Sequence, residues 1–410
     1  MTVTSYYISK EKRYTLEGES TYKLNDKDLL PFNVQNSPDG QPVCSKEDFE
    51  NYIKREVSAI FQKHFDNIVV LAGAGASVVT KSDGKIDDDY GKTMNMLAEA
   101  ISNYLDQHKE FFTLYEISKK CHYYNEKDNK EESDFLKNLN FENLISKIKS
   151  YSEFVEIAEK QKYDATVEQI FKKIIQYTNY DYNENIFKHS ALINTLNNFI
   201  KLPNKLTIVT TNYDTLFEDA ASLKNYTVFD GFTFSHEPRF DSDMFNWNLV
   251  RNIDNIKTQE FEYKRNTINL IKLHGSLTWI RKLDDIYRVG KTEADNPIMI
   301  FPSSEKYMQS YQTPYFELFT TFQEILRKQN TLLITTGFSF QDEHISQMIT
   351  GAIHHNKSLS VLVSDYNIDQ DNTFWKKLMQ LMNENYPISF LKASLNSNLL
   401  EYIGDNSNEY

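Results

Sequence analysis

The chain has 410 residues, of which 40% are apolar, so it can bury a substantial core and does not have a disordered composition. Its 45 Lys and Arg against 58 Asp and Glu give a formal charge of −13, which argues against a broad nucleic-acid surface. Only two cysteines are present, Cys44 and Cys121, so a four-thiolate zinc site is excluded. With no apolar leader and no apolar run of membrane length, the sequence predicts a cytoplasmic protein without a membrane span.

The N-terminal third of the chain predicts an arm, a helix, a strand and then a helical region. Residues 1–45 are polar and predict an irregular N-terminal arm, either a flexible tail or an oligomer contact. A helix is expected over 46–64 after the cap Ser45, and a strand buried on both faces over 67–72. From a helix near 92–108 onward, about 93–200 reads as a helical subdomain inserted into a sheet-based fold.

The C-terminal half alternates buried strands with helices. Helices are expected near 213–221, 314–329, 342–356 and 372–385, and strands at 206–209, 268–273, 332–335, 359–363 and 388–391. This alternation predicts an α/β fold, a Rossmann-like doubly wound parallel sheet over 46–395. A short helix is expected after the last strand, and residues 396–410 are expected to form a polar tail.

A glycine-rich turn follows the first strand directly. Gly73 and Gly75 allow a tight turn that brings the backbone, including Ala74, close to a pyrophosphate, and Ser77 adds a hydroxyl donor. The alternative is that these small residues serve only the packing of strand against helix. The segment alone does not distinguish a dinucleotide site from packing.

Polar residues also follow the next two long strands. Thr211, Asn212 and Asp214 offer a donor, an amide and a carboxylate, although Asn212 or Asp214 could simply cap a helix. His274 follows its strand within Lys-Leu-His-Gly-Ser, a position suited to a general base. The alternative is a histidine that is bonded to a backbone carbonyl.

Two further strands end in similar residues. Gly337 and Ser339 could contact phosphate or ribose, and Asp365 could contact the adenosine half of a dinucleotide. Asp342 is interpreted as a helix cap. Because parallel strands present their carboxyl ends at one edge of the sheet, these residues are expected to converge where a dinucleotide would lie.

In this order, GAGAS, TTNYD, LHGS, GFSF and SD resemble the motifs of the sirtuin superfamily, and more closely those of the sirtuin-like NADases of bacterial antiphage defence. The resemblance spans about residues 66–395. It implies that Gly73, Ala74, Gly75 and Ser77 hold the phosphates of NAD, and that Gly337, Ser339 and, more loosely, Asp365 contact phosphate and the adenosine ribose. It further implies that Asn212 orders water beside the nicotinamide ribose, that Asp214 lies at the nicotinamide end, and that His274 is the catalytic base.

The chain departs from the protein-deacylating sirtuins at two places, and residues 78–83 stand where those enzymes carry an acidic-Arg loop. Those enzymes carry a four-cysteine zinc module after the His-Gly motif, whereas residues 279–304 contain no cysteine, so no metal is expected. The resemblance then implies NAD as substrate and water as acceptor, giving ADP-ribose and nicotinamide, with cyclisation as a variant. A protein deacylase, an ADP-ribosyltransferase and a non-catalytic NAD or ADP-ribose module are the alternatives. A homo-oligomer and a partner in trans, such as a HerA-type hexameric ATPase, are expected by analogy.

Overall fold

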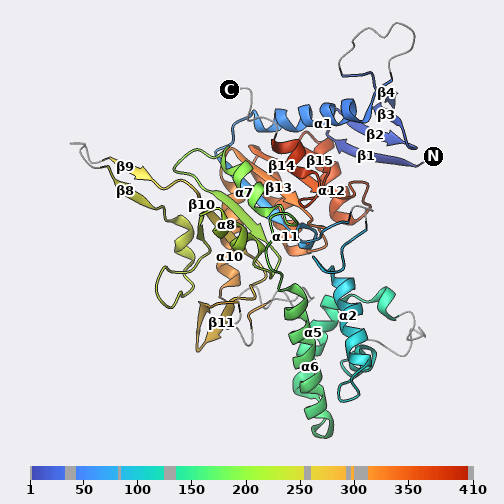
Figure 1. Cartoon of the computed structure of the whole chain (residues 1–410), viewed down its shortest axis with the longest axis vertical. Coiled ribbons are helices and arrows are strands. Elements are labelled where there is room, and N and C mark those ends of the chain that lie inside the picture. The colour runs from blue at the N-terminus through green and yellow to red at the C-terminus, as the bar shows by residue number, and fades with distance from the viewer. Residues whose placement is uncertain are drawn as a thin grey trace.

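A computed structural model describes residues 2–32, 43–81, 85–123, 135–253, 260–291, 297–299 and 313–404 of the chain. Its centre is an 11-stranded sheet with helices on both faces (Figure 1). The strand order is β4-β3-β2-β1-β15-β14-β13-β5-β6-β10-β7.

Seven neighbouring strands of this sheet run parallel and confirm the predicted doubly wound α/β fold. They are β5 (Asn67–Ala72), β6 (Leu206–Thr210), β7 (Thr227–Phe229), β10 (Thr267–Lys272), β13 (Thr331–Thr336), β14 (Leu359–Asp365) and β15 (Ile388–Lys392). The strands β6, β10 and β7 lie in this order on one side of β5. The chain then crosses back, so that β13 lies on the other side of β5. The carboxyl ends of β5 and β13 therefore flank the topological switch point, where doubly wound sheets bind ligands.

Alternate residues of each central strand enter two different cores. In β5, Val69 and Leu71 face one core, while Ile68, Val70 and Ala72 face the other. The first core is covered by α10 (Tyr315–Arg327), α11 (Glu343–His355) and α12 (Thr373–Asn383). The second is covered by α1 (Lys46–Phe61), α7 (His189–Asn197), α8 (Leu216–Leu223) and α13 (Leu399–Ile403). Burial on both faces explains why these strands read as continuous apolar runs.

The sequence predicted an irregular N-terminal arm, and this prediction is wrong, because the arm extends the sheet. It forms β1 (Val3–Ile8), β2 (Arg13–Glu17), β3 (Thr21–Leu24) and β4 (Lys27–Asp28), all antiparallel, and β1 pairs with β15. Tyr7 and Tyr14 are buried beneath α1, which supplies the burial that these short polar strands lack on their own. The short helix expected after the last strand is α13, which lies within the predicted polar tail, contacts α1 and buries Leu399 and Tyr402.

The helical insertion has a hydrophobic core of its own. It comprises α2 (Met94–Asp106), α3 (Leu114–Lys120), α5 (Phe141–Tyr151) and α6 (Ile157–Thr178), which project away from the sheet in Figure 1. α7 falls inside the predicted insertion but packs on the sheet through Leu192 and Ile193.

Two hairpins and several short turns were not predicted. The hairpins are β8 (Val250–Asn252) with β9 (Phe261–Tyr263), and β11 (Trp279–Lys282) with β12 (Asp285–Arg288). The 3-10 turns are η1 (Ala74–Ala76), η3 (Leu136–Asn138), η4 (Ser152–Phe154) and η5 (Ser242–Asn246). Across the described ranges, the helices are all too short or too polar to cross a bilayer.

Candidate functional site

The glycine-rich turn after β5 packs directly against the loop after β13. The Gly73 amide donates to the Thr336 carbonyl at 3.0 Å, and the Gly75 amide donates to the Gly337 carbonyl at 2.9 Å. A Cβ atom at Gly73 would lie 2.6 Å from the Gly337 carbonyl oxygen, and one at Gly75 would lie 2.7 Å from the Gly337 Cα. The packing alternative for these glycines is therefore present in the structure, and their contact with phosphates stays a prediction.

This close approach leaves the next residues of the turn at the edge of the sheet. Ala74 is exposed and Gly75 is half-buried, whereas Ser77 is buried and points into the protein. The Ser77 hydroxyl donates to Asp214 Oδ2 at 2.7 Å. Ser77 therefore connects the first turn to the polar segment that follows β6.

Asn212 binds the same turn through its side chain. Its Nδ2 donates to the Gly73 carbonyl at 3.0 Å and lies 2.9 Å from Ser77 Oγ, and its own amide donates to Thr210 Oγ1 at 3.0 Å. Thr211 extends the contact, since its amide donates to the Ala72 carbonyl at 3.1 Å. Asn212 is therefore not a helix cap, and these bonds fix the orientation of its amide.

Of the two roles that the sequence left open for Asp214, the structure shows the bond to the start of the following helix. Its Oδ1 accepts the Leu216 amide at the start of α8, while Oδ2 accepts from Ser77. Burial raises the pKa of Asp214, although the Lys272 ammonium and the Ser77 hydroxyl oppose that shift. Asp214 therefore has a structural role, and its place at the nicotinamide end of a ligand stays a prediction.

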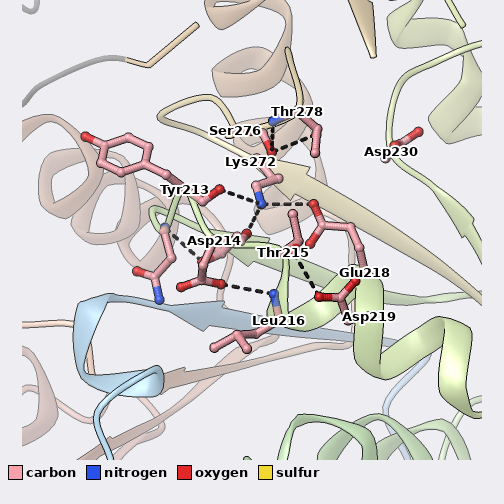
Figure 2. Close-up of polar contacts among 12 residues, drawn as sticks. Tyr213, Asp214, Thr215, Leu216, Glu218, Asp219, Asp230, Lys272, Ser276 and Thr278 are labelled. Carbon is pink, nitrogen blue, oxygen red and sulfur yellow. Dashed lines mark hydrogen bonds and ion pairs between the residues drawn. The ribbon is translucent and has the colours of Figure 1, made fainter. Parts of the chain in front are cut away.

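Lys272 holds the segment after β6 in place, a role that its sequence pattern did not predict. Its Nζ donates to the Asp214 carbonyl, to the Tyr213 carbonyl at 3.5 Å and to Glu218 Oε1 at 2.9 Å. Figure 2 shows this ammonium between the backbone of the segment after β6 and the side chain of Glu218 from α8. The signal in the sequence is a single lysine in a strand that is predicted to be buried, because a fully buried lysine requires partners.

His274 follows Lys272 at the end of β10 and is 5% exposed. Its Nε2 lies 3.1 Å from Asp342 Oδ2, so this ring nitrogen faces a carboxylate. The loop of His274 is held against the segment of Asn212, since the Leu277 amide donates to the Tyr213 carbonyl at 3.1 Å. The Asn212 and His274 loops therefore lie side by side at one edge of the sheet.

The candidate adenosine residues lie across the switch point, beyond β13 and β14. Ser339 is exposed, and its carbonyl accepts from Asn372 Nδ2 at 3.4 Å. Asn372 Nδ2 also donates to Gln370 Oε1, and Gln370 Nε2 donates to Asp365 Oδ1 at 3.2 Å. Burial raises the pKa of Asp365 to about 6. Ser339 and Asp365 thus belong to one hydrogen-bonded group, although the strands that carry them are separate.

No group of three or more histidine, cysteine or acidic side chains within the described residues is arranged to hold a metal ion. Both cysteines are buried as free thiols, and they belong to different cores.

The comparisons with known proteins found a similarity over one part of the chain. No curated protein matches it. A family model described as a SIR2-like domain matches residues 206–378, a range that contains Asn212, His274 and Asp342 but neither the Gly73 turn nor the helical insertion. Over the strands that carry the candidate site, the chain is therefore similar to SIR2-like domains.

Proposed function

We propose that this protein is an NAD glycohydrolase that converts NAD and water into ADP-ribose and nicotinamide. The observation that carries the proposal is the placement of Asn212 and His274 on adjacent loops at the switch-point edge, inside the range similar to SIR2-like domains. SIR2-like domains act on NAD. The nicotinamide half would lie near Asn212, Asp214 and His274, the phosphates near Gly73, Ala74, Gly75 and Gly337, and the adenosine half near Ser339 and Asp365.

The reaction needs positioning more than covalent chemistry. When the bond between ribose C1′ and the nicotinamide nitrogen breaks, its electron pair goes to the pyridinium ring and the ribose gains oxocarbenium character. A water oriented by Asn212 then forms the new bond to C1′. His274 accepts the proton from this water, directly or through a ribose hydroxyl.

The test is NAD consumption by the purified full chain, with products identified by chromatography. His274→Ala and Asn212→Ala are each expected to abolish NAD loss with the fold intact, because each removes a group that acts on the water or its proton. His355→Ala is the matched control, since that histidine is exposed at the far end of α11. Wild-type turnover by His274→Ala would show that this assignment is wrong.

The products separate this proposal from its alternatives. Incubation with labelled NAD and an acyl-lysine peptide should give plain ADP-ribose. O-acyl-ADP-ribose would indicate a deacylase, and labelled protein would indicate an ADP-ribosyltransferase. Binding of NAD without turnover under any condition would indicate a non-catalytic module.

We further propose that the enzyme is an antiphage defence effector that depletes NAD, that it assembles as a homo-oligomer, and that a partner in trans controls it. A free NADase would be toxic to its host, which supports control by a partner such as a HerA-type hexameric ATPase. The consumption assay is therefore run both with and without the product of the neighbouring gene.

A further inference from the structure

Asp342 makes two different sets of contacts with its two carboxylate oxygens. As the N-cap of α11, it uses Oδ1 to accept the His344 amide at 3.1 Å and the Ile345 amide at 3.2 Å. Its Oδ2 lies 3.1 Å from His274 Nε2, and the side chains of the two residues are 9% and 6% exposed. Capping uses one oxygen and could be performed by Ser or Asn, whereas the contact with His274 uses the second carboxylate oxygen.

Asp342 is held in place by the structure around it. The preceding segment packs into the core through Phe338 and Phe340, and Phe340 has a φ of 57°, a left-handed conformation that is costly for an aromatic residue. The Ser346 hydroxyl donates to the Phe340 carbonyl at 3.1 Å. The N-terminal end of the α11 dipole also favours negative charge at this position.

The contact has a consequence for the imidazole. A carboxylate can only accept a hydrogen bond, so the proton of neutral His274 lies on Nε2. The lone pair of the ring then lies on Nδ1. Positive charge that develops on the ring when it takes a proton is balanced by Asp342.

We propose that Asp342 is a positioning residue that fixes the Nε2–H tautomer of His274 and so makes Nδ1 the nitrogen that accepts the proton. The step itself rests on the proposed NAD hydrolysis. The water proton goes to Nδ1, the water oxygen bonds to C1′, and the departing nicotinamide keeps the electron pair of the broken bond.

Two variants of Asp342 test this role, and the more conservative substitution, Asp342→Asn, is expected to be the more damaging one. In Asp342→Asn the α11 amides retain the side-chain oxygen, so the NH₂ group faces His274 and forces Nε2 to accept, which places the ring proton on Nδ1. Asp342→Ser keeps the cap but is too short to reach the ring. We therefore expect kcat to fall by at least ~100-fold in Asp342→Asn and by only ~10-fold in Asp342→Ser, with KM changed less than either.

The tautomer is measured independently of activity, by NMR of the full chain with ¹⁵N-labelled histidine, with the His274 signals assigned from their loss in His274→Gln. The wild type is expected to show the Nε2–H form and Asp342→Asn the Nδ1–H form. Ser45→Ala, which removes the cap of α1 far from His274, is expected to change neither kcat nor these signals.

An Nδ1–H signature in the wild type would overturn the proposal, as would an Asp342→Asn variant with unchanged signature and unchanged kcat. If the wild type shows no NAD turnover but the signature inverts as expected, the proposed function fails while the positioning role of Asp342 stands.

Discussion

At the scale of single residues, the buried carboxylate of Asp365 lowers the free energy of unfolding at neutral pH. Its carboxyl is 4% exposed, and Oδ1 accepts from the Asn367 amide at 3.0 Å and from Gln370 Nε2 at 3.2 Å. Burial is the main cause that raises its pKa from 3.8 to about 6. At neutral pH the carboxylate is therefore ionised in an environment that penalises its charge.

The sign of the pH dependence follows from this shift. Because the folded state binds the proton more tightly than the unfolded state, stability from this group is fully present below pH 4 and is lost as pH rises through about 6. Asp365→Asn removes the penalty, so the free energy of unfolding should exceed that of the wild type by up to ~3 kcal/mol near pH 8 and by little near pH 4. Urea denaturation at both pH values measures this, with the exposed Asp371→Asn as control. An equal difference at both pH values would contradict the burial argument.

At the scale of elements, the site is held together where two glycine-containing loops touch. Gly337 has a φ of 59°, and a Cβ atom there would lie 2.3 Å from the Ala76 amide nitrogen. Gly351 lies in α11, where an added Cβ would meet nothing within 4 Å. A side chain is therefore excluded at Gly337 but tolerated at Gly351, although both glycines lie between β13 and β14.

We expect Gly337→Ala to destabilise the protein by at least ~2 kcal/mol, because neither the backbone conformation nor the opposing loop admits a side chain. Gly351→Ala should instead stabilise it by ~0.5–1 kcal/mol, because alanine favours a helix interior. Chemical denaturation of both variants measures the two changes. A shift of the same sign in both would show that the loop contact is not the constraint.

At the scale of the whole molecule, the insertion and the sheet have separate cores. Ile145 is fully buried among the helices of the insertion, whereas Ile208 of β6 is fully buried in the core on one face of the sheet. Leu277 and Met299, which follow β10, pack into the core of the insertion and connect it to the His274 loop. The insertion is thus placed to influence the site while remaining a separate packing unit.

Separate cores predict separate opening events. Ile145→Ala should accelerate hydrogen exchange in α2, α5 and α6 and leave β5 and β13 protected. Ile208→Ala removes the same groups from the sheet core and should accelerate exchange in the central strands. Mass spectrometry of exchanged peptides compares the variants. Uniform acceleration across the chain in Ile145→Ala would show that the two cores unfold as one.

The parts of the fold that the sequence predicts are those in which local pattern and burial agree. Apart from β7, which was not predicted, the parallel strands contain runs of apolar residues because both faces are covered, and helices such as α1 carry a cap and an apolar stripe. β1 to β4 were missed because their burial depends on α1 and on pairing with β15, neither of which the local residues reveal. The β11–β12 hairpin was missed for a similar reason, since Trp279 is buried by distant segments.

For the site, the sequence predicts which residue types stand at the strand ends, because a buried strand followed by Gly, Asn or His is a local pattern. It also placed Asp342 correctly at the start of α11. That Lys272 holds the Asp214 segment, that Gly73 and Gly75 pack on Gly337, and that Asp342 reaches His274 follow from the folded chain and not from any local pattern. The Lys272 and His274 contacts join residues 58 and 68 positions apart, and the glycine contacts join residues much farther apart in the chain. Such contacts depend on strand order, which is set by the packing of the whole sheet and not by any one segment.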